Sequence, residues 1–228
     1  MLKAKKSLNP KVTKRQLKED QFITKIFELY DLGRKYQKEI SYVIIAIIAV
    51  IALSYWVQQD KVVSEQNAAV ELSRGKAAFE SGQFDEAIDI LTALSQNFDG
   101  TMNAGAGLIY LGKAYGAKND YVNQEKYFQI YLDDYNDDDL LSVAAMRGLA
   151  VSYDERGDFA KAAQVYADAV DKFQDGYNAP QFLLDAAKCY LLADNLDAAK
   201  KCLEKIVVDY EKSPSLSEAK RLLAENSD

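Results

Sequence analysis

Apolar and polar residues divide this chain into three stretches with different patterns. Residues 1–39 mix basic and apolar positions, and Ile40 to Val57 form a block of 18 residues without a single charge. Beyond residue 57, apolar residues recur every three or four positions, which is the spacing of amphipathic helices. No alternating pattern of the kind that strands show is apparent. The sequence therefore predicts an all-α protein.

The uncharged block at 40–57 is long enough to cross a membrane as one helix. At 1.5 Å per residue it would extend about 27 Å, close to the ~30 Å of a hydrocarbon core. Aromatic and basic side chains near its ends suit the two membrane interfaces. These expected interface anchors are Lys35, Lys38, Tyr42, Tyr55 and Trp56.

Two other interpretations of the block compete with a membrane anchor. A buried core helix could be equally apolar, but the repeats described below leave it no obvious core to join. A cleaved signal peptide would fit the small residues of "ALS" at Ala52–Ser54. The basic segment before the block is, however, far longer than the leader of a normal signal peptide. We therefore expect one uncleaved membrane helix.

Charge differs in sign on the two sides of the block. Residues 1–41 contain eleven Lys or Arg and five Asp or Glu, which gives a net charge of +6. The rest of the chain has 17 basic and 30 acidic residues, a net charge of −13. Because basic segments next to a membrane helix stay in the cytoplasm, we expect residues 1–41 there and residues 58–228 outside it.

The segments that flank the membrane helix have patterns of their own. Residues 16–39 are expected to form a cytoplasmic amphipathic helix, which would lie on the inner membrane surface or against another membrane protein. Its apolar face would carry Phe22, Ile26, Leu29, Tyr30, Gly33 and Tyr36. Residues 1–15 are basic and patternless, which is typical of disorder. Residues 58–67 contain no Gly or Pro and are expected to continue the membrane helix as a helical stalk.

From residue 68 onward the chain repeats with a period of 37 or 38 residues. Aromatic residues mark the period at Phe98, Tyr135, Phe173 and Tyr210. Small residues mark the same period at Gly75, Gly112, Ala150 and Ala187. Twelve residues later, three units have a second small residue, at Ala87, Ala162 and Ala199, whereas the second unit has Gln124. Because two residue classes share one period, the sequence predicts a repeat protein.

Each unit is expected to consist of two helices joined by a sharp turn. The residue at the turn tolerates the left-handed backbone that ends a helix. These residues are Gly82, Asn119, Gly157 and Asp194. The units are expected at about 68–104, 105–142, 143–179 and 180–216. Residues 217–228 start a fifth unit but complete only one helix, which suits a polar cap at the end of a solenoid.

The segments "LGKAY", "GQFDEAIDIL" and "RGDFAKAAQVYADAV" resemble tetratricopeptide repeats. The matching positions are Gly75, Ala87, Gly112, Tyr115, Phe128, Ala150, Tyr153, Ala162, Tyr166, Ala169, Ala187, Tyr190 and Ala199. Three features depart from the pattern: a period above the usual 34 residues, the missing Pro after most second helices, and Gln124. The resemblance implies an α-solenoid of four helix pairs with a C-terminal capping helix. Together with the apolar block, the expected fold has a single N-terminal transmembrane helix followed by this solenoid.

The residue types offer no catalytic or metal-binding arrangement. The chain has no His, which removes the commonest general base and the commonest metal ligand. No Gly-rich phosphate loop is present. The acidic run Asp133–Asp139 lacks the glycine and the final glutamate of a calcium loop. We therefore expect no enzymatic activity, no cofactor, no metal and no small-molecule substrate.

Cys189 and Cys202 are the only cysteines, and the repeat register puts them on the two helices of the fourth unit. An oxidising compartment would permit a disulfide between them. The alternative is that both are small buried hydrophobic side chains, which is the usual behaviour of a free cysteine.

The first helix of each unit is expected to line the concave face of the solenoid. Lys76, Lys113 and Lys188 directly follow the small residue of that helix, and the third unit has Val151 there with Arg147 one turn earlier. Apolar residues of the same helices are Leu72, Phe79, Ile109, Leu184 and Leu191. This pattern favours a groove for an extended or partly unfolded protein segment. Ordinary solvated lysines are the alternative.

The whole layout of short cytoplasmic segment, one membrane helix and extracytoplasmic repeats resembles the ancillary SecYEG translocon subunit family (YfgM-like). The resemblance implies a bacterial inner-membrane scaffold with a periplasmic repeat domain. Its partners would be Sec translocon subunits, a membrane-anchored periplasmic chaperone and emerging secretory chains, with no nucleic acid. An envelope-assembly or cell-division adaptor that organises cell-wall enzymes is the alternative function.

Overall fold

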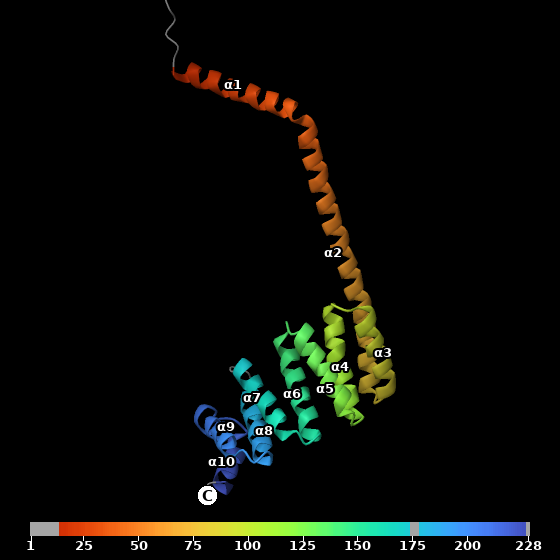
Figure 1. Ribbon diagram of the computed structural model, residues 1–228, viewed down its shortest axis with the longest axis vertical. Coiled ribbons are helices and arrows are strands. Elements are labelled where there is room, and N and C mark those ends of the chain that lie inside the picture. The colour runs from red at the N-terminus through yellow and green to blue at the C-terminus, as the bar shows by residue number, and fades with distance from the viewer. Residues whose placement is uncertain (1–13, 174–177, 227–228) are drawn as a thin grey trace, which may run out of the picture. The chain divides into compact units, whose positions relative to one another are not determined.

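A computed structural model describes residues 14–173 and 178–226 of the 228-residue chain. These residues form helices and contain no strand, as Figure 1 shows. The chain divides into two compact units, Met1–Asp60 and Lys61–Asp228. The segment expected to be disordered, 1–15, lies outside the described residues except for its last two positions, which begin a helix.

The first unit contains helix α1 (Lys14–Lys35) and the beginning of helix α2 (Gln37–Glu80). Only Tyr36 separates them, and backbone hydrogen bonds bridge the junction, from Tyr36 N to Leu32 O at 3.0 Å and from Ile40 N to Tyr36 O at 2.8 Å. The expected boundary between residues 39 and 40 therefore falls inside α2. Phe22 lies among the residues whose side chains are not described.

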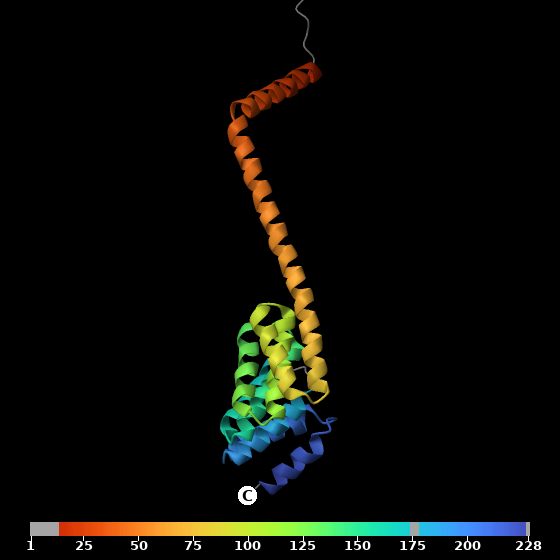
Figure 2. The same cartoon turned by 90° about the vertical axis from the view of Figure 1, so that its right-hand side faces the viewer.

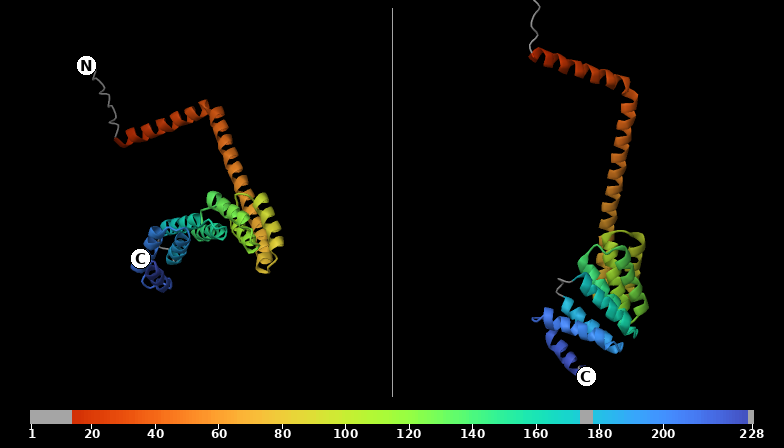
Figure 3. Two further views of the ribbon diagram at one scale, coloured as in Figure 1. Left: turned by 60° about the horizontal axis from the view of Figure 1, so that its bottom comes forward. Right: turned by 60° about the vertical axis from the view of Figure 1, so that its left-hand side comes forward.

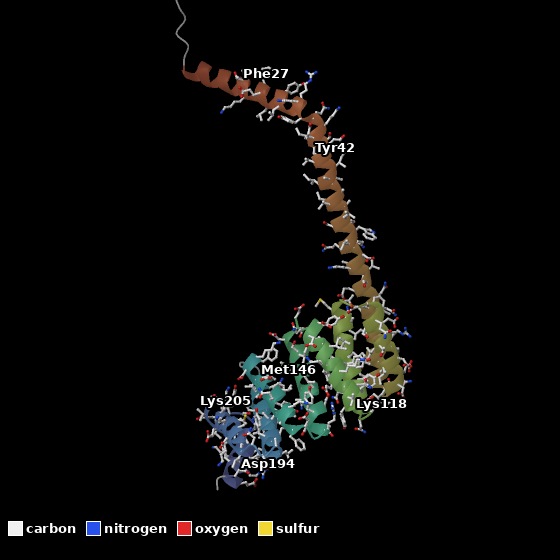
Figure 4. The ribbon with its side chains drawn as sticks, in the orientation of Figure 1. Phe27, Tyr42, Lys118, Met146, Asp194 and Lys205 are labelled. Carbon is white, nitrogen blue, oxygen red and sulfur yellow. The ribbon has the colours of Figure 1, made fainter. Side chains whose placement is uncertain are left out.

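Apolar side chains of the first unit are exposed. Figure 4 labels Phe27 on α1 and Tyr42 on α2, with exposed fractions of 64% and 70%. The predicted anchors Tyr55 and Trp56 are equally exposed. Among the described helices, α2 alone is long and apolar enough to cross a membrane, with a mean hydropathy of 2.4 over its most apolar 18 residues and none of these buried.

The second unit is a series of helical hairpins, visible from two sides in Figures 1 and 2. The end of α2, from Lys61 to Glu80, is the first helix of the series. The others are α3 (Phe84–Asn97), α4 (Met102–Ala117), α5 (Tyr121–Asp134), α6 (Asp139–Glu155), α7 (Phe159–Lys172), α8 (Ala179–Leu192), α9 (Leu196–Asp209) and α10 (Leu216–Glu225). From α3 onward each helix contacts the next, and α4 also contacts α6.

The turns within the hairpins have the left-handed backbone that the sequence predicts. The φ angles are 75° at Gly82, 59° at Asn119, 77° at Gly157 and 56° at Asp194. After each turn, a backbone N–H bonds to a carbonyl five residues earlier, for example from Asp120 N to Tyr115 O at 2.9 Å. This bond satisfies a carbonyl that the helix end would otherwise leave free. The prediction for all four turn positions is confirmed.

The periodic aromatic residues lie where the second helix of each unit ends. Phe98, Tyr135, Phe173 and Tyr210 are the residues directly after α3, α5, α7 and α9. Tyr135 also links two units, since its hydroxyl donates to Asp99 Oδ1 at 2.7 Å and accepts from Gly100 N at 2.9 Å. The aromatic residues therefore recur at the same interval as the hairpins along the chain.

The periodic small residues lie in the core between helices. Ala87, Ala150, Ala162, Ala187 and Ala199 are fully buried. Gly75 is also buried, and a Cβ at this position would lie 2.5 Å from Leu91 Cδ2. Two hydrophobic clusters result, one formed by the end of α2 together with α3–α6 and the other formed by α6–α10. Since close helix packing needs small side chains at the contact, the second periodicity has a direct structural cause.

Candidate partner-binding site

The cations predicted to line the groove are on the surface. Lys76 on α2, Lys113 on α4, Arg147 on α6 and Lys188 on α8 are all exposed. Leu72, Phe79, Val151 and Leu191 are half-buried. These eight residues can reach a partner.

Two of the predicted apolar contacts belong to the core. Ile109 and Leu184 are 1% and 4% exposed, because each side chain faces the helices behind it rather than solvent. The assignment of Ile109 and Leu184 to the groove is therefore corrected. Each residue lies four positions before the lysine of its helix and therefore on the same side of that helix, but it is packed within a hydrophobic cluster formed with neighbouring helices.

A groove of about 370 Å³ lies between α4, α6 and α8, over the side of α5. It brings together three predicted residues, Lys113, Arg147 and Val151. Figure 3 gives two further views of these helices. Residues that the sequence pattern did not select complete its lining: Gln124, Phe128, Leu140, Val143, Ala144, Gly148, Asn178 and Phe182. The groove is thus lined mainly by apolar side chains and contains two cations.

The four predicted cations differ in the acids that lie close to them. Lys76 Nζ lies 3.7 Å from Glu80 Oε1, and Lys188 Nζ lies 3.6 Å from Glu218 Oε1 on α10. Within the described parts of the chain, no carboxylate lies at ion-pair distance from Lys113 or Arg147. The two cations without a paired acid are those that line the groove.

Aromatic contacts support the lysines at the α2–α4 end. Lys76 Nζ and Lys113 Nζ lie 5.7 and 5.2 Å from the ring centre of Tyr110. Phe79 packs edge-on against the same ring at 5.8 Å. Such contacts hold an ammonium group near an aromatic face without removing its charge.

Gln124 supplies an unsatisfied polar atom to the groove. This residue is only 6% exposed, and its Oε1 is a buried side-chain atom without a hydrogen-bond partner among the described residues. A buried acceptor without a donor costs about 1–3 kcal/mol. The sequence signal for this residue was present, because Gln124 is the one position that breaks the small-residue period.

One acid lies close to the groove. Burial raises the pKa of Asp185 on α8, and a hydrogen bond from Gln181 together with the charges of Arg147 and Lys188 opposes that rise. Gln181 Nε2 donates to Asp185 Oδ1 at 2.9 Å. The acid therefore has a bound partner of its own and is not paired with Arg147.

Cys189 and Cys202 are free thiols that face different neighbours. Cys189 is buried, and its Sγ lies 3.8 Å from Asp154 Oδ1 on α6. Cys202 is half-buried, and this burial raises the pKa of its thiol. No disulfide links the two residues in this structure.

A larger cavity of about 720 Å³ lies at the other end of the repeats, between the start of α8 and the loop that joins α9 to α10. Its lining includes Pro180, Tyr210, Lys212 and Pro214 but none of the predicted groove residues. Among the described residues, no three His, Cys, Asp or Glu side chains gather as metal ligands would. The groove between α4, α6 and α8 is the better candidate for the partner-binding site, because it contains predicted residues and the larger cavity does not.

Comparison with known proteins bears on the fold of these hairpins. Two family models, both described as tetratricopeptide repeat, match the chain: one over residues 72–139 and 126–177, the other over residues 155–225. Together they cover almost all of the second unit. No curated protein sequence gives a significant match.

Solved structures share this arrangement at low sequence identity. A protein from Podosopora anserina with nearly identical TPR-like repeats, assigned as a kinesin light chain, is 15% identical, with a TM-score of 0.57 over 71% of this chain and 86% of that one. A tetratricopeptide repeat protein from Parabacteroides merdae is 17% identical, with a TM-score of 0.59 over 71% of this chain and 60% of that one. At such identities the likeness shows the fold alone.

Proposed function

Because this chain is a tetratricopeptide repeat protein, we propose that it is a non-enzymatic scaffold, held at a membrane by the apolar part of α2. Repeat solenoids of this type present extended surfaces to protein partners. The groove between α4, α6 and α8, with its apolar lining and two cations, is the surface on which we expect a partner to bind.

The observation that carries the membrane proposal is the exposure of the block at 40–57. Large apolar side chains along it, among them Ile45, Ile48 and Ile51, are about 60% exposed. At about 25 cal/mol per Å² of apolar surface, such a helix is strongly unfavourable in water and favourable in lipid. The aromatic residues Tyr42 and Trp56 at its ends suit the two interfaces.

Charge supports an orientation for this anchor. The +6 of residues 1–41 and the −13 of the remainder favour a cytoplasmic N-terminus and an extracytoplasmic repeat domain under the positive-inside rule. In a bacterial inner membrane the repeats would then be periplasmic. The exposed apolar side chains of α1 would contact the inner leaflet or another membrane protein.

The partners that we propose are Sec translocon subunits, a membrane-anchored periplasmic chaperone and emerging secretory chains. This proposal draws on the resemblance of the layout to the ancillary SecYEG translocon subunits. It also fits a groove that combines apolar and charged contacts, as binding of an unfolded segment requires. The protein would hold chaperones close to the exit of the translocon.

Co-purification in mild detergent tests the proposed partners. Tagged full-length protein, cross-linked in cells before extraction, should retain translocon subunits and a periplasmic chaperone above the level of an unrelated single-pass membrane protein. Recovery of peptidoglycan synthases in their place would favour the envelope-assembly adaptor. If neither set is enriched, the scaffold proposal at this location is wrong.

Topology can be tested independently of the partners. We expect a chain that keeps its N-terminus and whose repeat domain is degraded by protease only when the outer membrane has been permeabilised. A control tag at the N-terminus should survive the same treatment. A mature protein that begins near Tyr55 would refute the anchor.

A further inference from the structure

Helix α1 carries large apolar side chains that no other part of the described chain covers. Six of them are about half to two-thirds exposed, from 48% at Ile26 to 67% at Leu29. They are Ile23, Ile26, Phe27, Leu29, Tyr30 and Leu32. No side chain described on α1 is buried. So many exposed apolar side chains on one short segment mark a binding surface.

These side chains occupy one broad sector of the helix. At about 100° per residue, the six fall within an arc of about 220°. The exposed residues Lys25 and Arg34 lie near the two edges of this arc, whereas Glu28 and Lys35 lie in the remaining sector. Basic side chains at the edges of an apolar sector suit a helix in a membrane interface, because their stems can follow the apolar surface while their charges reach the headgroups.

The end of α1 is close in sequence to the start of the proposed membrane span. Helix α1 ends at Lys35, and the uncharged block begins at Ile40. Five residues of helix rise by about 8 Å, which is about the depth of one polar interface of a bilayer. With the block in the membrane, the end of α1 therefore lies at headgroup level. The helix break at Tyr36 allows α1 to lie along the surface.

The width of the apolar sector favours a lipid surface over a partner helix. Packing against one helix covers a stripe of about 100°, which would leave more than half of the arc in water. A helix is about 10–12 Å across, and an interfacial helix sinks about 5–10 Å into the bilayer. Immersion to that depth covers half of the circumference or more and so accounts for the whole arc.

Charge favours one kind of lipid. Residues 1–41 have a net charge of +6, and basic segments next to a membrane helix are attracted to anionic headgroups. Zwitterionic lipids would accept the apolar sector but would leave this charge without a counterpart.

We propose that α1 binds the surface of the cytoplasmic leaflet as an in-plane helix, with anionic lipid headgroups beside Lys25 and Arg34. The proposal rests on the proposed membrane anchor. It assigns α1 to lipid rather than to another membrane protein.

Fluorescence quenching of the full-length chain in nanodiscs tests the position of α1. In a background with Cys189→Ala and Cys202→Ala, one new cysteine is labelled with the dye NBD. The substitution Ile26→Cys puts the label at the centre of the arc, and Glu28→Cys puts it outside the arc. In nanodiscs with equal parts of phosphatidylcholine and phosphatidylglycerol, acrylamide should quench the label at position 26 at least about fivefold less than the label at position 28.

The same labels test the requirement for anionic lipid. In nanodiscs of phosphatidylcholine alone, the protection at position 26 should weaken at least about threefold, and salt should weaken it in the anionic nanodiscs. Substituting both Lys25→Gln and Arg34→Gln should have the same effect without loss of helix propensity. Lys61→Gln removes an exposed cation beyond the other end of the block. This matched control should leave the protection unchanged.

Three results would overturn the proposal. Equal quenching of the two labels in nanodiscs, combined with protection of position 26 in native membrane vesicles, would mean that another membrane protein covers α1. Equal quenching in nanodiscs and vesicles alike would leave α1 in water. Equal protection in both lipid compositions would mean that α1 binds a bilayer without needing anionic headgroups.

Failure of this proposal and failure of the proposed anchor give different results. A full-length chain that does not co-purify with nanodiscs would refute the membrane anchor itself. A chain that enters nanodiscs, but whose label at position 26 is quenched as strongly as the label at position 28, would refute only the binding of lipid by α1.

Discussion

The carboxamide of Gln124 lies flat against Gly116, where an added Cβ would come within 2.8 Å of Gln124 Cδ and Oε1. In the first unit the equivalent positions are Phe79 and Ala87, a large residue on the first helix and a small one on the second. In the second unit the small residue, Gly116, is on the first helix and the large residue, Gln124, is on the second. The contact therefore still pairs one large residue with one small residue, while its chemistry changes from apolar to polar.

This exchange of sizes predicts a compensating pair of substitutions. Gly116→Phe alone should destabilise the repeats by about 1–3 kcal/mol, because the ring cannot share its space with Gln124. Adding Gln124→Ala restores the arrangement of the first unit and should recover most of that loss. Urea unfolding of the two single variants and the double variant measures the coupling, expected to exceed about 1 kcal/mol. Simple additivity would contradict the exchange.

Gly148 on α6 is expected to resist substitution more than any other glycine of the repeats. Alanine normally stabilises a helix interior by up to about 1 kcal/mol relative to glycine. At Gly148, however, the new Cβ would lie 2.1 Å from Phe128 Cε2. We therefore expect Gly148→Ala to lower the free energy of unfolding by about 1–3 kcal/mol. Phe128→Leu should partly rescue it, and an unchanged melting temperature would show that Phe128 can move aside freely.

Ala162 provides a test of the repeat register with a neighbouring control. Ala162 is fully buried in α7, whereas Ala160 of the same helix is exposed. Ala162→Leu should force helices apart and cost about 1–3 kcal/mol, and Ala160→Leu should change the stability by less than about 0.5 kcal/mol. Thermal unfolding followed by circular dichroism compares them. Equal melting temperatures would mean that the register is wrong.

The two thiols should differ sharply between the folded and unfolded chain. Burial, reinforced by the charge of Asp154, raises the pKa of Cys189 to about 12. Since the thiolate is the reactive form, alkylation of Cys189 at pH 8 should be on the order of a thousandfold slower in the folded protein than in urea. The Cys202→Ala variant isolates this thiol for measurement. A difference of less than tenfold would contradict the buried position.

The same thiol makes stability depend on pH in the alkaline range. Because its pKa is higher in the folded than in the unfolded chain, folding favours the protonated form. The stabilisation is fully present below about pH 9 and is lost as the pH rises toward 12. Urea midpoints for wild type and Cys189→Ala should therefore converge as the pH rises. Parallel curves would exclude Cys189 as the source.

Helix α2 has no Gly or Pro between Gln37 and Arg74, which predicts a stiff connection between the apolar block and the first repeat. Insertion of two glycines after Asp60 should reduce co-purification of partners without changing the melting temperature of the repeats. An insertion of two alanines preserves helix propensity and is the control. Partner binding that survives the glycines unchanged would mean that the connection serves only as a tether.

The sequence by itself determined the repeating architecture, because its two periodic signals arise from local requirements. Turn residues such as Asn119 and Asp194 must tolerate positive φ, and small residues such as Ala162 must let helices approach. Because each hairpin needs the same residue type at the same position, these residue types recur at a regular interval along the sequence. The same reasoning located the exposed cations Lys113 and Arg147.

Only the tertiary structure decided which of these residues share a site. The period does not tell the inner from the outer face of a first helix, so Ile109 and Leu184 were assigned to the surface although they belong to the core. Nor could it show that Glu218 lies beside Lys188 while Lys113 and Arg147 have no ion pair among the described residues, since the Lys188–Glu218 contact joins helices of different units. In the sequence, Gln124 is only a break in the small-residue period. The structure explains this break, because the Gln124 side chain packs against Gly116. Which side chains contact each other depends on how neighbouring hairpins stack. The stacking is set in turn by the volumes of all the residues between the hairpins.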